Sequence, residues 1–322
     1  MNTFGELFKI SIFGRSHGRV LGVVVDGVPV GIALKADDFE EDLQRRRAGG
    51  LGKTERVEAD LPQIVGGTHR GFTSGDPLCI FFENQDKKSS DYDIDFYRPS
   101  HTDFVSAKKY KNFADRAGGG HFSGRLTLPL VAAGVVAKKI LKNFIFKTNL
   151  LEVGGSKNIK AKVLEAVKQK DSVGGLISCV VGNIPIGLGE PFFYSVESAI
   201  SWMLFSIPAV KAVEFGAGVD VAKRYGSQNN DTILNGNGKT LTNNDGGVVG
   251  GITNGNPLVV RVAIKPTSSI GKPQNTFNFK QNKVVSSTLC GRHDACIALR
   301  AEVVVEAAVA IGLCDLFLCK KG

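Results

Sequence analysis

The stretch GGTHRGFTSGDPL at residues 66–78 is the most informative about the fold, because a similar stretch, GGVVGGITNGNPL, occurs 180 residues later at residues 246–258. The two copies align without a gap. Both read GGxxxG, an apolar residue, Thr, a polar residue, Gly, Asp or Asn, and then Pro-Leu. A β-prone run follows each copy, at 79–82 and at 259–262. The pattern predicts a glycine-rich turn that leads into a strand in each half of the chain.

A second repeat relates VVDGVPVG at 24–31 to VVGNIPIG at 180–187, and each half ends in a long helix candidate. We therefore expect one domain over 1–322, built from similar halves at about 1–148 and 175–322 that are related by an internal pseudo-two-fold duplication. Strands joined by Gly-rich turns, with helices between, predict an α+β fold with antiparallel sheets. The expected strands are 9–13, 21–26, 78–83, 177–181 and 258–264, and the expected helices are 38–47, 126–144, 159–168, 196–205 and 295–318.

The composition of the chain indicates which classes of ligand and partner to expect. The 40 Lys and Arg against 31 Asp and Glu give a charge of +9, which favours small anionic ligands. Nucleic acid is not expected, because the chain has one Trp and its 20 Phe mostly lie in apolar runs. The six scattered cysteines form no CxxC pair, so we expect free thiols and no metal site. The longest apolar run, 126–137, is far below the roughly 20 residues of a membrane span, so we expect a soluble, cytoplasmic protein.

Two phosphate-binding motifs are only apparent. The run Gly49 to Thr54 ends like a P-loop, but that motif requires glycine where this chain has Arg47. The run Gly216 to Gly218 lacks the third glycine of a dinucleotide-binding turn. Neither a nucleoside triphosphatase nor a Rossmann fold is expected.

Four of the five histidines are flanked by Gly, Arg or Ser, namely His17, His101, His121 and His293. Glycine lets the backbone approach a ligand, arginine grips phosphate or carboxylate, and histidine exchanges protons near neutral pH. The combination predicts an active site for an anionic substrate that needs proton transfer.

Six ordered motifs resemble the chorismate synthase family from residue 4 to about 315: FGRSHG (13–18), DGVP (26–29), RRRAG (45–49), RPSHTD (98–103), ITNGNP (252–257) and GRHDAC (291–296). The resemblance implies a lyase of the shikimate pathway that converts 5-enolpyruvylshikimate 3-phosphate to chorismate and phosphate by 1,4-anti elimination. It also implies reduced FMN as cofactor, a β-α-β sandwich with helices between two antiparallel sheets, and a homotetramer.

The resemblance assigns roles residue by residue. His17 would protonate the departing phosphate, His101 would set the protonation state of the flavin, and Asp294 would relay the flavin proton. Substrate would be held by Arg46, Lys53, Arg56, Arg98, Arg125 and Arg292, although which of Arg45, Arg46 and Arg47 points inward stays open. Flavin contacts would come from Ser123, Gly124, Arg125, Gly251, Ile252, Thr253, Asn254, Gly255, Lys265, Ser268, Ser269 and Arg292.

The chain departs from the family pattern in three places. Arg15 replaces the usual acid beside His17, and we expect its charge to lower the pKa of that histidine. His121 stands where arginine is usual, and we expect it to replace a phosphate contact. Asp245 stands where an uncharged residue is usual.

Two other classes of protein remain open from the residues alone. One is a phosphate-sugar or nucleotide-binding module without catalysis, and the other is a flavin-dependent oxidoreductase with a site for an electron donor. The sequence also leaves open whether FMN is reduced by an intrinsic NADPH activity or by an external reductase.

Overall fold

The computed structural model describes residues 1–47, 50–52, 58–85, 96–289 and 294–321. Its two main sheets are antiparallel throughout. The first sheet has the strand order β1 (Thr3–Phe4), β2 (Lys9–Gly14), β3 (Val20–Asp26), β7 (Leu78–Glu83) and β4 (Gln63–Gly66). The second has the order β10 (Val210–Phe215), β13 (Leu258–Ile264), β9 (Gly175–Gly182) and β8 (Ile145–Val153).

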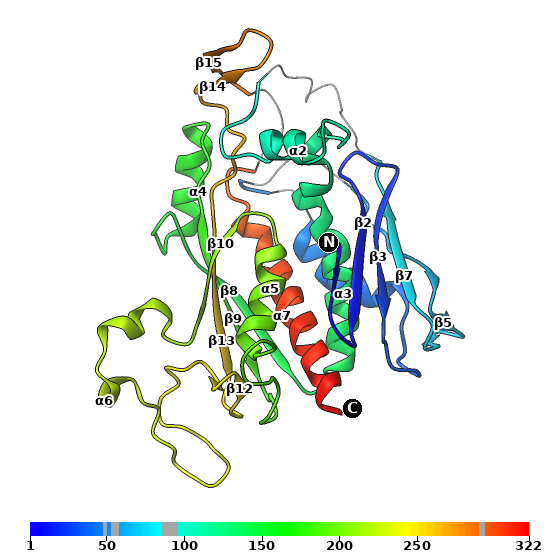
Figure 1. The fold of residues 1–322 in the computed structure, drawn as a ribbon, viewed down its shortest axis with the longest axis vertical. Helices are drawn as coiled ribbons and strands as arrows, with labels where there is room; N and C mark the ends of the chain where they lie inside the picture. The colour runs from blue at the N-terminus through cyan, green and yellow to red at the C-terminus, as the bar shows by residue number, and fades with distance from the viewer. Residues whose placement is uncertain (48–49, 53–57, 86–95, 290–293, 322) are drawn as a thin grey trace.

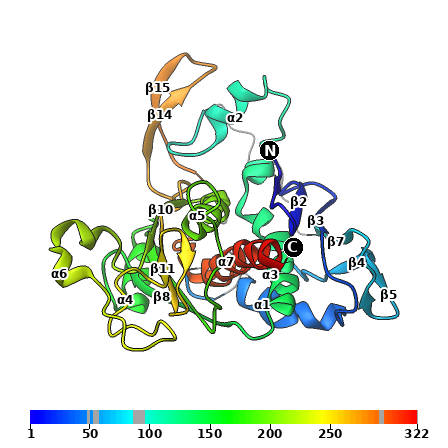
Figure 2. The ribbon, with the colours of Figure 1, turned by 60° about the horizontal axis from the view of Figure 1, so that its bottom comes forward.

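A layer of helices separates the two sheets, as Figures 1 and 2 show from two directions. The four helices of this layer are α1 (Glu40–Arg46), α3 (Thr127–Ile140), α5 (Val196–Ser206) and α7 (Ala298–Lys321). α3 packs on β3 of the first sheet, and α7 packs on β8 and β9 of the second. The predicted sandwich with helices between antiparallel sheets is confirmed.

Smaller elements surround this frame. They are the helices α2 (Asp103–Lys109), α4 (Ile159–Lys168) and α6 (Gly226–Asn229), and the 3-10 turns η1 (Ala36–Phe39), η3 (Ala117–Phe122), η4 (Gly124–Leu126) and η5 (Gly218–Lys223). Three hairpins complete them: β5 (Thr68–His69) with β6 (Phe72–Thr73), β11 (Val248–Val249) with β12 (Ile252–Thr253), and β14 (Gln274–Asn278) with β15 (Lys283–Ser287).

Burial explains why these segments take these forms. β13 alternates buried and half-buried residues along its length, as a strand with one face on a core must. α3 is buried at every residue from Thr127 to Ala137, because helices press on it from one side and a sheet from the other. Gly134 allows the closest approach, since a Cβ built there would lie 2.4 Å from Ala307 Cβ on α7. Any side chain at Gly134 would push α3 and α7 apart.

The two sheets share one strand order: β2-β3-β7-β4 corresponds to β8-β9-β13-β10. The register corresponds as well, because Val25 pairs with Leu78 in the first sheet and Val181 pairs with Leu258 in the second. Val25 and Val181 lie 156 positions apart, and Leu78 and Leu258 lie 180 positions apart. These are the two shifts that relate the sequence repeats. These coincidences support an internal duplication, which stays a prediction.

The repeated turns also make the same hydrogen bonds. The Thr73 hydroxyl donates to the Pro29 carbonyl at 2.6 Å, and the Thr253 hydroxyl donates to the Pro185 carbonyl at 2.7 Å. Each threonine lies in the hairpin that precedes a central strand, and each proline lies in the other repeated motif. The two sequence repeats therefore form one hydrogen-bonded turn in each half.

Most expected elements are found, several to the residue, as with 78–83, 159–168 and 258–264. The helix expected at 126–144 is too long, because α3 ends at Ile140 and the chain enters β8 at Ile145. β8 pairs with β9, so the strands of the two sheets divide near residue 142. β8 gave no clear signal because it is an edge strand whose polar residues, such as Lys147 and Asn149, face solvent.

Candidate active site

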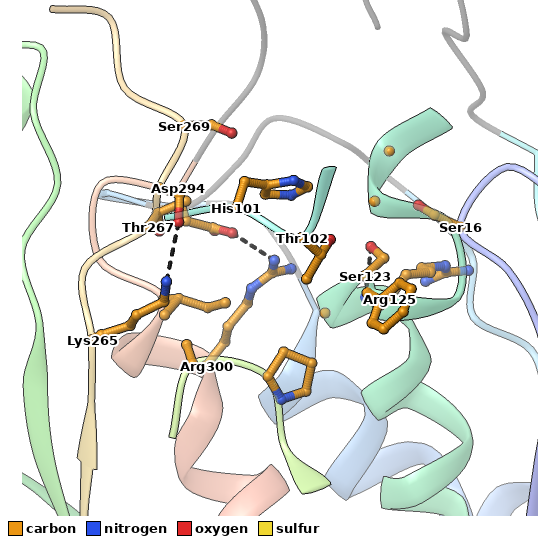
Figure 3. A pocket seen from close by; sticks show the side chains of 18 of the residues that line it. Ser16, His101, Thr102, Ser123, Arg125, Lys265, Thr267, Ser269, Asp294 and Arg300 are labelled. Carbon is orange, nitrogen blue, oxygen red and sulfur yellow. Dashed lines mark hydrogen bonds and ion pairs between the residues drawn. The ribbon is translucent and has the colours of Figure 1, made fainter. Parts of the chain in front are cut away.

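A cavity of about 310 Å³ lies at the end of the sandwich where α3 and α7 begin (Figure 3). Segments from both halves of the chain line it. They include the turn after β2, the end of α1, the loop at 98–102, the 3-10 turns at 118–125, the segment 265–269 after β13, and the start of α7. The site is therefore formed only when the two halves meet.

Buried arginines dominate one wall of the cavity. The Asp60 carboxylate lies 2.5 Å from Arg125 Nη1 and 3.6 Å from Arg46 Nη1, and all three side chains are buried. Burial first, and then the charge of Arg300, lower the pKa of Arg46 to about 9, so Arg46 stays protonated at neutral pH. Positive charges held this close favour an anionic ligand.

The structure answers which of the three successive arginines points inward. Arg46 lines the cavity and donates to Thr127 Oγ1 at 3.0 Å. Arg47 also lines it, but its guanidinium bonds to nearby α1 and loop atoms. Arg45 points the other way and forms an ion pair with Glu306 at 2.8 Å. The position of Arg46 agrees with its proposed contact to substrate, and that role stays a prediction.

Arg98 and His101 share one carboxylate. Arg98 grips Asp103 with two hydrogen bonds, of 2.7 and 2.8 Å, and Asp103 also lies 2.8 Å from His101 Nδ1. Although burial opposes it, the hydrogen bonds from Arg98 and His101 hold the pKa of Asp103 well below its usual range. Asp103 therefore accepts, and the shared proton belongs to Nδ1 of His101. Both Arg98 and His101 line the cavity.

The triglycine run at 118–120 passes close to both catalytic histidine candidates. A Cβ built on Gly118 would lie 2.7 Å from His17 Nε2, and one on Gly119 would lie 3.8 Å from His101 Nε2. All three glycines have positive φ, so the chain turns tightly here. The run therefore lies beside both histidines; His101 lines the cavity, whereas His17 does not and contacts its wall at Gly118.

Asp294 is buried at the cavity wall, and Arg300 donates to its Oδ2 at 2.6 Å (Figure 3). Arg300 lies in the first turn of α7. Its charge also acts on Arg46, as the lowered pKa of Arg46 shows. The Asp294–Arg300 ion pair therefore lies within electrostatic reach of Arg46.

Five further residues that the resemblance assigns to flavin binding also line this cavity: Ser123, Gly124, Lys265, Ser268 and Ser269. Burial, and then the charge of Lys211, lower the pKa of Lys265. Three atoms of residues that line the cavity, Arg47 Nε, Arg125 Nη2 and Thr267 Oγ1, are buried without a hydrogen-bond partner among the described residues. Such atoms are expected where a polar ligand binds.

The other residues assigned to flavin binding, 251–255, lie away from this cavity. Gly251, Ile252, Thr253, Asn254 and Gly255 belong to the β11–β12 turn and do not line the cavity. The Gly251 carbonyl accepts from the first residue of α5, whereas residues just past the end of α5 reach the cavity. The 11 residues of α5 span about 16 Å at 1.5 Å each, so this turn lies about one helix length from the cavity.

Three candidates, Lys53, Arg56 and Arg292, lie outside the described residues. Of the unusual residues, Arg15 is exposed and forms an ion pair with Asp115 at 3.2 Å. His121 does not line the cavity, because its ring nitrogens bond to the Gly14 carbonyl at 2.7 Å and to the Asn2 side chain at 3.0 Å. These contacts do not support the expectation that His121 replaces a phosphate contact, and that expectation stays untested. Asp245 lies away from the cavity as well, beside Asp231.

Sequence reasoning missed three charged residues of the cavity: Glu58, Asp60 and Arg300. Arg300 did carry a signal, because it is the one basic residue in the helix candidate 295–318, whose other charged residues are acidic. Asp60 carried none, since a single aspartate in a loop is commonplace. Among the described residues no group of His, Cys, Asp and Glu is arranged to hold a metal ion. None of the described helices has the length and apolar character to cross a membrane.

Comparison with known proteins agrees with this geometry. The family model of chorismate synthase matches residues 8–318. A chorismate synthase of Chitinophaga pinensis is 54% identical over 324 residues, covering 100% of this chain and 98% of that protein. One of Thermococcus kodakarensis is 42% identical and covers 98% of each. A crystal structure of chorismate synthase matches with a TM-score of 0.77 at 25% identity, covering 99% of this chain and 94% of that one. The chain therefore belongs to the chorismate synthase family.

Proposed function

We propose that this protein converts 5-enolpyruvylshikimate 3-phosphate to chorismate and phosphate by 1,4-anti elimination. One observation supports this most directly: one cavity is lined by buried arginines, His101 and the Asp294 carboxylate, and His17 lies against its wall at Gly118. The substrate carries a phosphate and two carboxylates, and the arginines match this charge. The reaction needs proton transfer to the leaving group, and the histidines can supply it.

Substrate binding falls to the arginine wall. Arg46 and Arg125 are fixed by Asp60, so little conformational entropy is lost when they bind an anion. Arg125 Nη2, which has no partner among the described residues, is available for a substrate oxygen. Arg98, fixed by Asp103, contributes a further positive charge to the cavity lining. Lys53, Arg56 and Arg292 complete the proposed set.

The family indicates a flavin, and we propose FMN in its reduced form. The cavity fits such a group, because Thr267 Oγ1 is a buried hydroxyl without a partner among the described residues and the cavity wall at Gly118 and Gly119 carries no side chains. Ser123, Gly124, Arg125, Lys265, Ser268, Ser269 and Arg292 would hold it. When bound, reduced FMN supplies electron density as phosphate leaves and takes up the ring hydrogen.

The protein's own groups would manage the protons. His17 lies beside the triglycine run and donates a proton to the departing phosphate. His101 keeps its proton on Nδ1 because the Asp103 carboxylate accepts there, which leaves Nε2 to face the site near Gly119. Asp294, held by Arg300, accepts and passes on the ring-derived proton.

We also propose a homotetramer and a cytoplasmic location, both from the family. The flavin contacts assigned to residues 251–255 require a second copy of the chain, because that turn lies about one α5 length from the cavity of its own chain. A tetramer can provide such a copy.

An anaerobic assay tests the function. Chemically reduced FMN and 5-enolpyruvylshikimate 3-phosphate are added to the protein, and phosphate and chorismate are followed together. We expect equal amounts of both and many turnovers per reduced flavin. A flavin-dependent oxidoreductase would stop after one turnover per flavin, and a binding module would release neither product. Either result with folded protein refutes the proposal.

A further inference from the structure

Arg300 occupies an electrostatically unfavourable position. It lies in the first turn of the 24-residue helix α7, where the helix dipole is positive. Its charge also lowers the pKa of the buried Arg46 nearby, after burial itself. The Asp294 carboxylate, 2.6 Å away, offsets part of this repulsion, and such local conflicts are expected at functional sites.

The charges along the cavity wall favour a bound anion. Among the described residues that line the cavity, six are cationic, namely Arg46, Arg47, Arg98, Arg125, Lys265 and Arg300, and three are acidic, namely Glu58, Asp60 and Asp294. The described lining therefore carries an excess of positive charge. Arg125, whose side chain is 7% exposed, has its Nη2 buried without a partner among those residues while it lines the cavity. An anion in the cavity would meet both the excess charge and the unpaired nitrogen.

Arg300 has the geometry to join that anion to Asp294. Its guanidinium reaches Asp294 Oδ2 at 2.6 Å through Nη2, which uses one of five N–H donors. The side chain is half-buried, with 17% exposed, and lines the cavity (Figure 3). The planar fork of arginine can bind a carboxylate on one edge and a second oxyanion on the other.

We propose that Arg300 is a further binding and positioning residue of this site, which contacts the anionic group of the substrate and holds Asp294 against it. This inference rests on the proposed function, because it takes the substrate to be a phosphorylated polycarboxylate. It adds Arg300 to the arginines predicted from the sequence and gives Asp294 its orientation.

Binding measurements test the proposal without turnover. The full chain with oxidised FMN is titrated with 5-enolpyruvylshikimate 3-phosphate, and separately with inorganic phosphate, by calorimetry. We expect Arg300→Gln to weaken substrate binding at least tenfold and Arg300→Lys to weaken it less. The control is Arg261→Gln on β13, which removes a similar ion pair, to Glu214 at 2.9 Å, outside the cavity. Substrate affinity of Arg300→Gln within twofold of this control overturns the proposal.

The positioning role has its own readout. Loss of an anion contact alone raises KM, whereas a displaced Asp294 also slows turnover at saturating substrate. We expect Arg300→Gln to lower kcat at least tenfold, and Arg300→Lys, which keeps the charge and most of the packing, to restore much of it. An unchanged kcat in Arg300→Gln refutes this role. Wild-type protein that binds inorganic phosphate but makes no chorismate refutes the proposed function alone.

Discussion

Gly118→Ala tests whether the triglycine run positions His17. Gly118 has φ of 60° and ψ of 22°, in the left-handed region. A methyl group there would lie 2.7 Å from His17 Nε2 and 2.7 Å from Ser16 Oγ. Neither atom is the end of a long side chain that can swing aside, so we expect the imidazole to move.

The expected size of the effect follows from these distances. Ordinary contact begins near 3.4 Å, so the imidazole must retreat by about 0.7 Å. A displacement on the order of 1 Å at a catalytic group costs about 100-fold in rate. We expect kcat to fall about 100-fold, with a much smaller change in substrate affinity. The left-handed backbone adds a stability cost of about 1–2 kcal/mol, because alanine is disfavoured there.

The assay is anaerobic turnover with reduced FMN, combined with thermal unfolding. Gly71→Ala is the matched control, because Gly71 has φ of 80°, lies outside the cavity, and has open space within 4 Å of the point that a new methyl group would occupy. Both variants should lose a similar few degrees of Tm, and only Gly118→Ala should lose turnover. A kcat for Gly118→Ala within threefold of Gly71→Ala would refute the positioning of His17 by Gly118.

The site and the core can be probed at three other residues. His17→Ala should lose most turnover yet still bind substrate with oxidised FMN, as calorimetry can show; wild-type turnover would remove its role as acid. Arg15→Glu should keep or raise kcat, because Arg15 is exposed and pairs with Asp115, and a large loss would make Arg15 a substrate contact. Burial raises the pKa of Glu306, but the Arg45 hydrogen bond and a nearby lysine outweigh it and lower that pKa from 4.5 to about 2. This stabilisation, on the order of 3 kcal/mol, is present above pH 4.5 and lost as the pH falls toward 2, so Glu306→Gln should flatten the urea-unfolding profile between those values; parallel profiles would contradict it.

The sequence predicted the strands and helices well where burial repeats with a regular period. β7 and β13 were located to the residue, because each follows a glycine-rich turn and alternates inward and outward side chains. β8 was missed, because an edge strand shows solvent-facing polar residues at alternate positions and resembles a loop. Local pattern is informative only where one face of an element is buried.

For the site, the motifs brought His17, His101, Arg98 and Asp294 to attention, but not how they meet. The pairing of Arg98 and His101 on Asp103 has a local origin, since the three lie within six residues. Such contacts can be inferred from spacing. The lining of one cavity by residues from both halves cannot.

The family, the two repeated turns and the principal strands could be inferred from the amino-acid sequence, because they depend on short-range patterns of glycine, proline and alternating burial. Which charged side chains meet depends on the packing of distant segments. In the folded protein Arg45 points toward Glu306 and Arg46 points toward the cavity. Asp60 and Arg300 both act on the charge of Arg46, although 240 residues separate them. The reason is physical: the direction of a side chain in the central helix layer depends on what packs against each face, and those neighbours come from distant parts of the chain.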